Sequence, residues 1–153
     1  MESVWDYPRP PRVERSQARV TVEHSGMVIA DSIGCWRVLE TSHPPVYYVP
    51  RADIVDGVLQ PGAGSSYCEF KGTASYWDVV VGDTRVAQAG WSYEHPVPAY
   101  LEIVGAVAFY PSRVDACRVG DELVRAQEGD FYGGWITADI TGPFKGGPGT
   151  LGW

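Results

Sequence analysis

The chain has 153 residues, of which 44% are hydrophobic and 20% charged, and this composition is ordinary for a soluble globular protein. A single domain of this size buries roughly 70% of its unfolded surface, so it can form a core without disulfides or a structural metal. Nineteen acidic side chains against twelve basic ones give a net charge of −7, which argues against nucleic acid and anionic membranes as partners.

The first residues show no targeting signal, because Met1–Pro8 has neither a basic start nor an apolar stretch. No apolar run approaches the ~20 residues of a membrane span, and we expect a cytoplasmic protein. The cysteines, Cys35, Cys68 and Cys117, are odd in number and include no Cys-x-x-Cys pair. We therefore expect reduced thiols, with Cys35 and Cys117 in the core.

In chain order, residues 1–16 are rich in Pro, Arg and Glu and show no periodicity. They are predicted to form an extended arm that Trp5 and Tyr7 hold against a single domain over residues 17–153. Three two-residue turns containing glycine then predict antiparallel hairpins. The turns are Ser25-Gly26 within Arg19–Asp31, Gly82-Asp83 within Val79–Val86, and Gly120-Asp121 within Ala116–Val124.

Helical patterns are short, because only Ala52–Leu59 and Pro98–Val104 could hold a turn or two. The fold class is therefore mainly β. The tail, 131–153, alternates glycines with large rings and is predicted to be an irregular strap that covers the sheet. A phosphate loop around Lys145 is not expected, since Gly146 follows and no helix comes after it.

Several sequence blocks resemble domain-of-unknown-function family 427, and the resemblance covers essentially the whole chain. They are Ser3-Val-Trp-Asp-Tyr-Pro-Arg-Pro-Pro11, Leu39-Glu-Thr-Ser-His-Pro-Pro45, Tyr67-Cys-Glu-Phe-Lys-Gly72, Val107-Ala-Phe-Tyr-Pro111 and Phe144-Lys-Gly-Gly-Pro-Gly149. Members are small, mostly microbial, soluble proteins of mainly β fold, similar to the β-tent of methionine sulfoxide reductase B. The resemblance thus implies a β-tent-like single domain, but no activity, because fold similarity alone does not establish function.

The family also carries a nucleotidyltransferase label, which the residues can test. Familiar nucleotidyltransferases have Gly-Ser followed by an Asp-x-Asp pair that holds two metal ions. Gly64-Ser65 is present, but no Asp-x-Asp occurs in the chain. The paired Cys-x-x-Cys zinc ligands of the reductase are missing as well. We therefore disfavour the label and expect no cofactor.

Two polar segments, Leu39–Pro50 and Tyr67–Trp77, bring carboxylates, a histidine, a thiol, an amine and many aromatic rings into a short stretch. Such a mixture is typical of a ligand pocket. If Tyr67–Lys71 is a strand, Glu69 and Lys71 share one face and can form an ion pair in the site. Cys68 then points with Phe70 into the core unless a bulge intervenes.

Glu40-Thr-Ser-His43 is predicted to be a loop after a strand, because two prolines follow it. His43 could act as a general base or only bond a neighbouring backbone group. A metal site of Glu40, His43 and Glu69 has no spacing signature, and pairing of Cys68 with His43 conflicts with the strand faces. His24 and His95 are expected to be solvated.

Two functional hypotheses remain open, and both place a small molecule in an aromatic pocket. In the first, the protein is an enzyme acting on a small polar or carbonyl-bearing metabolite, with Glu69 moving a proton, Lys71 anchoring an anionic group and His43 orienting the substrate. In the second, it is a non-catalytic module that binds a ligand or peptide end. The candidate ligand-binding residues are Glu40, Thr41, Tyr48, Cys68, Tyr76, Trp91 and Tyr110. We expect a monomer or homodimer; a structural protein is the alternative if these groups lie dispersed.

Overall fold

Each of the three predicted turns joins two antiparallel strands in the computed structural model, which describes residues 1–153. They connect β3 (Val20–His24) to β4 (Met27–Ser32), β8 (Gly72–Val81) to β9 (Thr84–Ser92), and β11 (Ala116–Val119) to β12 (Glu122–Leu123). Gly82 and Gly120 have φ of 57° and 59°, as a type II′ turn requires at its first central position. Local turn chemistry therefore determines these hairpins.

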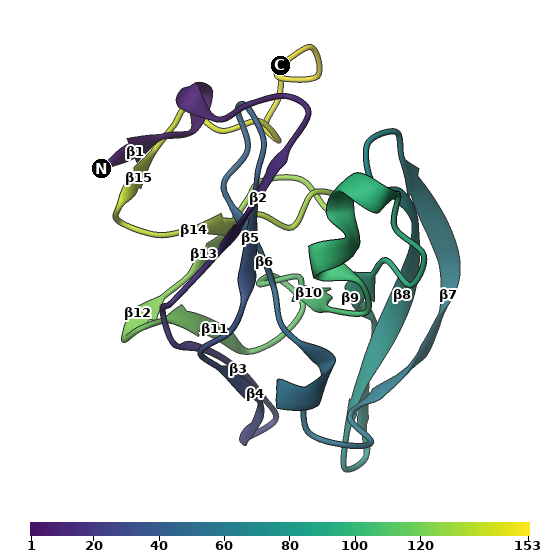
Figure 1. The fold of residues 1–153 in the computed structure, drawn as a ribbon. Helices are drawn as coiled ribbons and strands as arrows, with labels where there is room; N and C mark the ends of the chain where they lie inside the picture. The colour runs from purple at the N-terminus through teal and green to yellow at the C-terminus, as the bar shows by residue number, and fades with distance from the viewer.

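The strands form several small sheets rather than one (Figure 1). In one four-stranded sheet, β10 (Val107–Phe109), β9, β8 and β7 (Leu59–Cys68) are neighbours, and in another β12, β11, β3 and β4 are neighbours. A three-stranded sheet contains β2 (Arg12–Arg15), β5 (Trp36–Leu39) and β6 (Val46–Tyr48). Two short pairs complete the set: β13 (Arg125–Ala126) with β14 (Trp135–Ile136), and β1 (Glu2–Ser3) with β15 (Ile140–Thr141). All pairs except β1 with β15 are antiparallel, so the predicted mainly β class is confirmed.

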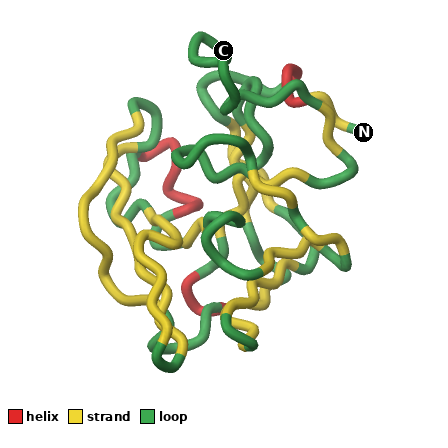
Figure 2. Tube along the Cα trace, turned by 180° about the vertical axis from the view of Figure 1, so that it is seen from behind, coloured by secondary structure: helices red, strands yellow, loops and turns green.

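The helical content consists of three 3-10 turns (Figure 2), η1 (Val4–Asp6), η2 (Arg51–Asp53) and η3 (Pro98–Ile103). The prediction at Pro98–Val104 is confirmed, and the other predicted turn begins earlier and is shorter. The backbone is extended at Ile54 (φ −107°, ψ 134°), which ends η2 after three residues. No helix has the length and apolar character needed to cross a membrane.

Two hydrophobic clusters form the core. The first fills the space between the sheets and contains Cys35 and Cys117, which confirms their predicted burial. Burial raises the pKa of these thiols to about 11 and about 12, so both are unreactive at neutral pH. The second cluster is rich in aromatic rings and includes Tyr48, Trp91 and Tyr93. A bridge between Val49 and Val107, with hydrogen bonds of 2.8 and 2.9 Å, joins β6 to β10 beside it.

The first sixteen residues contain two strands and a 3-10 turn, so they are more structured than an extended arm. β1 pairs with β15 near the end of the chain, and β2 pairs with β5. Val4 and Tyr7 are buried against Leu39. The guanidinium of Arg37 on β5 bonds Glu14 on β2 at 3.0 Å and Glu2 on β1 at 3.2 Å. Arg37 thereby links both strands of this segment to the domain.

The predicted strand Tyr67–Lys71 is wrong. β7 ends at Cys68, β8 begins at Gly72, and Cys68 is the partner of Gly72 in the register. The three residues between them form the hairpin turn, and Gly72 adopts a φ of +114° that favours glycine. In a turn the alternation of faces no longer holds, so Cys68 and Lys71 can point the same way. This local geometry positions the candidate site.

Candidate functional site

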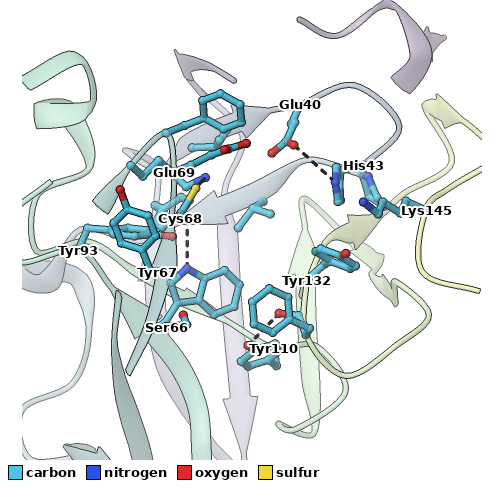
Figure 3. A pocket seen from close by; sticks show the side chains of 18 of the residues that line it. Glu40, His43, Ser66, Tyr67, Cys68, Glu69, Tyr93, Tyr110, Tyr132 and Lys145 are labelled. Carbon is cyan, nitrogen blue, oxygen red and sulfur yellow. Dashed lines mark hydrogen bonds and ion pairs between the residues drawn. The ribbon is translucent and has the colours of Figure 1, made fainter. Parts of the chain in front are cut away.

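A cavity of about 240 Å³ lies where three distant parts of the chain meet. One wall is the tip of the β7–β8 hairpin, the opposite wall is the segment from β5 to β6, and the C-terminal strap adds Phe131, Tyr132 and Lys145. Figure 3 shows Cys68 and Glu69 on one side of this space, with His43 and Lys145 on the other. All the candidate site residues line the cavity except Thr41.

The hairpin wall places an amine against a thiol. Lys71 is only 7% exposed, and its Nζ donates to Sγ of Cys68 at 3.3 Å. Nζ also lies 5.8 Å from the ring centroid of Tyr93. No carboxylate approaches Nζ within 4.0 Å, so the predicted ion pair of Lys71 with Glu69 is not formed. Glu69 is exposed at the turn because it sits outside the strand that would have aimed it inward.

The opposite wall holds a carboxylate, an imidazole and a second amine. Oε2 of Glu40 lies 3.3 Å from Nε of Arg9 and 3.7 Å from Nε2 of His43. The His43 ring packs edge-on against Tyr132, with centroids 4.8 Å apart, and Nζ of Lys145 lies 5.3 Å from the same Tyr132 ring. The backbone amide of Lys145 donates to the Ser42 carbonyl oxygen at 2.9 Å, which ties the strap to this wall.

Hydrogen bonding sets the tautomer of His43. The Gly134 amide donates to Oε1 of Gln127 at 3.0 Å, so the amide NH2 of Gln127 points the other way. That NH2 lies 3.2 Å from Nδ1 of His43 and 2.7 Å from the Lys145 carbonyl oxygen. Nδ1 must therefore accept, and the proton of the neutral ring is on Nε2, which faces Glu40.

His43 is uncharged at neutral pH. Burial, then the positive charges of Lys145, Arg9 and Lys71, lower its pKa to about 4. The ring thus presents a neutral N–H donor on the side of Glu40.

Aromatic rings form the floor. Nε1 of Trp91 donates to the Tyr48 hydroxyl at 3.2 Å, and the Trp91 and Tyr110 ring centroids are 4.7 Å apart. The Tyr110 hydroxyl donates to the Phe131 carbonyl oxygen at 3.0 Å. Burial raises the pKa of Tyr48, Tyr93 and Tyr110, so the phenols stay neutral and the floor contributes rings and no charge.

Several residues of the cavity were not expected from sequence. Lys145 and Tyr132 line the cavity although they lie far along the chain. Gln127 is not in the cavity lining and carries no motif, and only the fold reveals that it bonds His43. Thr41 instead donates to the Tyr7 carbonyl oxygen at 2.5 Å and anchors the N-terminal segment.

The sequence disfavoured both a Cys68–His43 pair and a metal site of Glu40, His43 and Glu69, whereas the expectation that His24 is solvated is wrong. Cys68 and His43 lie on opposite sides of the cavity (Figure 3), and no hydrogen bond joins them. Glu40, His43 and Glu69 do not form a metal site, because no group of three or more His, Cys, Asp or Glu is placed to hold a metal ion. His24 is buried, 3.7 Å from Asp115, because it lies on the inward face of β3, whereas His95 is exposed as expected.

Comparison with known families adds one finding. The family model described as a domain of unknown function (DUF427), with the label NTP_transf_9, matches residues 12–120. The chain belongs to the DUF427 family. No curated protein matches it. The matched range contains Glu40, His43, Cys68 and Lys71, whereas Lys145 lies beyond its end.

Proposed function

We propose that this DUF427 protein binds a compact anionic metabolite in the cavity, with the ammonium of Lys71 as the anchor. The observation that carries the proposal is the burial of Lys71 without an acidic partner. A largely buried ammonium without a carboxylate partner is costly, and a ligand carboxylate or phosphate would supply the missing charge. The volume of about 240 Å³ suits a small ligand rather than a nucleotide.

The remaining walls suit the same class of ligand. Lys145 adds a second positive charge, and the N–H of His43 adds a neutral donor. Neither carboxylate of the cavity pairs with Lys71: Glu40 forms an ion pair with Arg9, and Glu69 is exposed at the turn. Neither competes with an anion for Nζ of Lys71, and the aromatic floor covers an apolar part.

Amide NMR titrations with acetate, pyruvate, succinate and inorganic phosphate test the proposal. We expect at least one anion to shift amides around the cavity, and Lys71→Met to weaken its binding at least about tenfold, or 1.4 kcal/mol. Arg19→Met is the matched control, because it removes a positive charge from an exposed site paired with Asp31. Equal binding by wild type and Lys71→Met would remove Lys71 as the anchor and contradict the proposal.

A second candidate is catalysis in the same cavity, with Glu69 as the group that moves a proton. Glu69 is exposed beside Cys68, where it can exchange protons with solvent. His43 is better suited to donate a hydrogen bond than to act as a base, because its Nε2 already carries the proton. Under this hypothesis Glu69→Gln abolishes turnover of a bound metabolite while its affinity persists. Retention of full turnover in that variant would exclude Glu69 as the acid–base group.

The nucleotidyltransferase label of the family finds no support in this chain. Gly64-Ser65 lies inside β7, and the chain has no Asp-x-Asp pair to hold two metal ions. A small anion therefore remains the better proposal.

A further inference from the structure

We propose that the ligands are small 2-oxo carboxylates and that Cys68 bonds covalently to their carbonyl carbon. This inference rests on the anion site proposed above. It adds a chemical role for the sulfur that lies beside the anchoring ammonium.

The position of the sulfur selects the reactive atom of the ligand. Sγ of Cys68 is 3.3 Å from Nζ of Lys71, about the length of one hydrogen bond. A carboxylate that accepts from Nζ therefore brings its attached carbon next to Sγ. In a 2-oxo acid this carbon is a carbonyl carbon, which is the electrophile that a thiol attacks.

Cys68 is the one thiol of the chain suited to this reaction. It is half-buried and lines the cavity, whereas Cys35 and Cys117 are fully buried in the first core cluster. The thiolate is the nucleophilic form of cysteine, and the ammonium of Lys71 lies where it pairs with that charge. The cavity thus contains the nucleophile and the anion anchor as neighbours.

The step is an addition that needs no oxidant and releases no group. The bond between Sγ of Cys68 and C2 of the ligand forms, and the π bond between C2 and its oxygen breaks. The proton lost by the thiol ends on that oxygen, so the product is a thiohemiketal. His43 and Lys145 line the opposite wall and are the further N–H donors of the cavity.

Alkylation of the wild-type protein tests the pairing of sulfur and anchor without any mutation. Iodoacetate and iodoacetamide react by the same displacement of iodide and differ mainly in charge. We expect the ratio of the alkylation rate with iodoacetate to that with iodoacetamide to be at least about tenfold higher for Cys68 than for N-acetylcysteine. Pyruvate should slow the alkylation of Cys68. Peptide mapping should find Cys35 and Cys117 unmodified. The inference would be overturned if Cys68 did not react, or if its ratio of the two alkylation rates equalled that of N-acetylcysteine.

Carbon NMR with [2-¹³C]pyruvate tests the covalent step itself. Wild type should convert the ketone signal into that of a tetrahedral carbon, and Cys68→Ser should lose this signal while acetate still shifts its cavity amides. Pyruvate that binds both proteins equally and stays a ketone refutes the covalent step and leaves the anion site intact. If neither pyruvate nor any other anion shifts cavity amides in wild type, both proposals are wrong.

Discussion

The side-chain NH2 of Gln127 lies 3.2 Å from Nδ1 of His43 and places the proton of the neutral ring on Nε2, the nitrogen that faces Glu40. Gln127 is itself oriented by the Gly134 amide and the Lys145 carbonyl oxygen, and it is 4% exposed. The tautomer of the imidazole is therefore determined by hydrogen bonds from the C-terminal part of the chain.

Gln127→Glu should reverse this arrangement. A carboxylate cannot donate, so Nδ1 would have to carry a proton, and the added negative charge should raise the pKa of His43 by roughly 1–3 units. Nitrogen-detected NMR of the imidazole reports the tautomer and the titration directly. An unchanged Nε2–H tautomer in this variant would show that Gln127 does not control the ring.

Acid should destabilise the protein through His43. The pKa is about 4 in the folded state and 6.5 for the unperturbed group, so between these values the unfolded chain binds more protons. Stability contributed by the neutral ring is thus present above pH 6.5 and is lost as the pH falls towards 4, by about 3 kcal/mol at most. Urea unfolding at several pH values should show that the unfolding free energy of His43→Gln changes less with pH than that of wild type. Parallel curves would mean that the burial of His43 is not linked to stability.

A methyl group at Gly133 should disturb the floor of the cavity. The residue has a φ of +69°, and a Cβ would lie 2.7 Å from the Trp91 ring and 3.0 Å from that of Tyr110. We expect Gly133→Ala to cost about 2–4 kcal/mol in unfolding free energy and to change tryptophan fluorescence. Gly152→Ala is the matched control, because nothing lies within 4 Å of its Cβ, and it should change stability by less than about 0.5 kcal/mol. Similar stability of the two variants would contradict the close packing at Gly133.

Removing the carboxylates around Arg37 should destabilise the protein more than removing the arginine itself. Arg37→Met removes a buried charge and keeps the volume, whereas Glu2→Gln with Glu14→Gln leaves the guanidinium buried without a carboxylate. We expect the double variant to lose about 3 kcal/mol and Arg37→Met to lose less. Denaturant unfolding measures both, and the opposite order would show that burial of Arg37 is not costly.

Local signals in the sequence were sufficient for the hairpins but not for the site. Ser25-Gly26, Gly82-Asp83 and Gly120-Asp121 each specify a turn within a few residues, so strand pairing around them was predictable. The segment Tyr67–Lys71 has residues suited to a strand, and its turn became visible only from the pairing of Cys68 with Gly72.

The composition of the cavity shows the same limit of local reasoning. The polar segments around His43 and Lys71 were recognisable by their residue types. Gln127 lies 84 residues from His43, whose Nδ1 it bonds, and the Lys145 carbonyl that accepts from Gln127 lies 18 residues further along the chain. No periodicity or spacing rule connects these three residues. Contacts of this kind depend on how the last segment folds back over the domain.

The family model ends at residue 120, whereas Phe131, Tyr132 and Lys145 complete the cavity beyond that point. The anchor and the thiol thus lie within the matched residues, and the strap that faces them lies beyond the match. Because these three residues supply one wall of the cavity, we expect exchange of the strap between two family members to change which ligand is preferred.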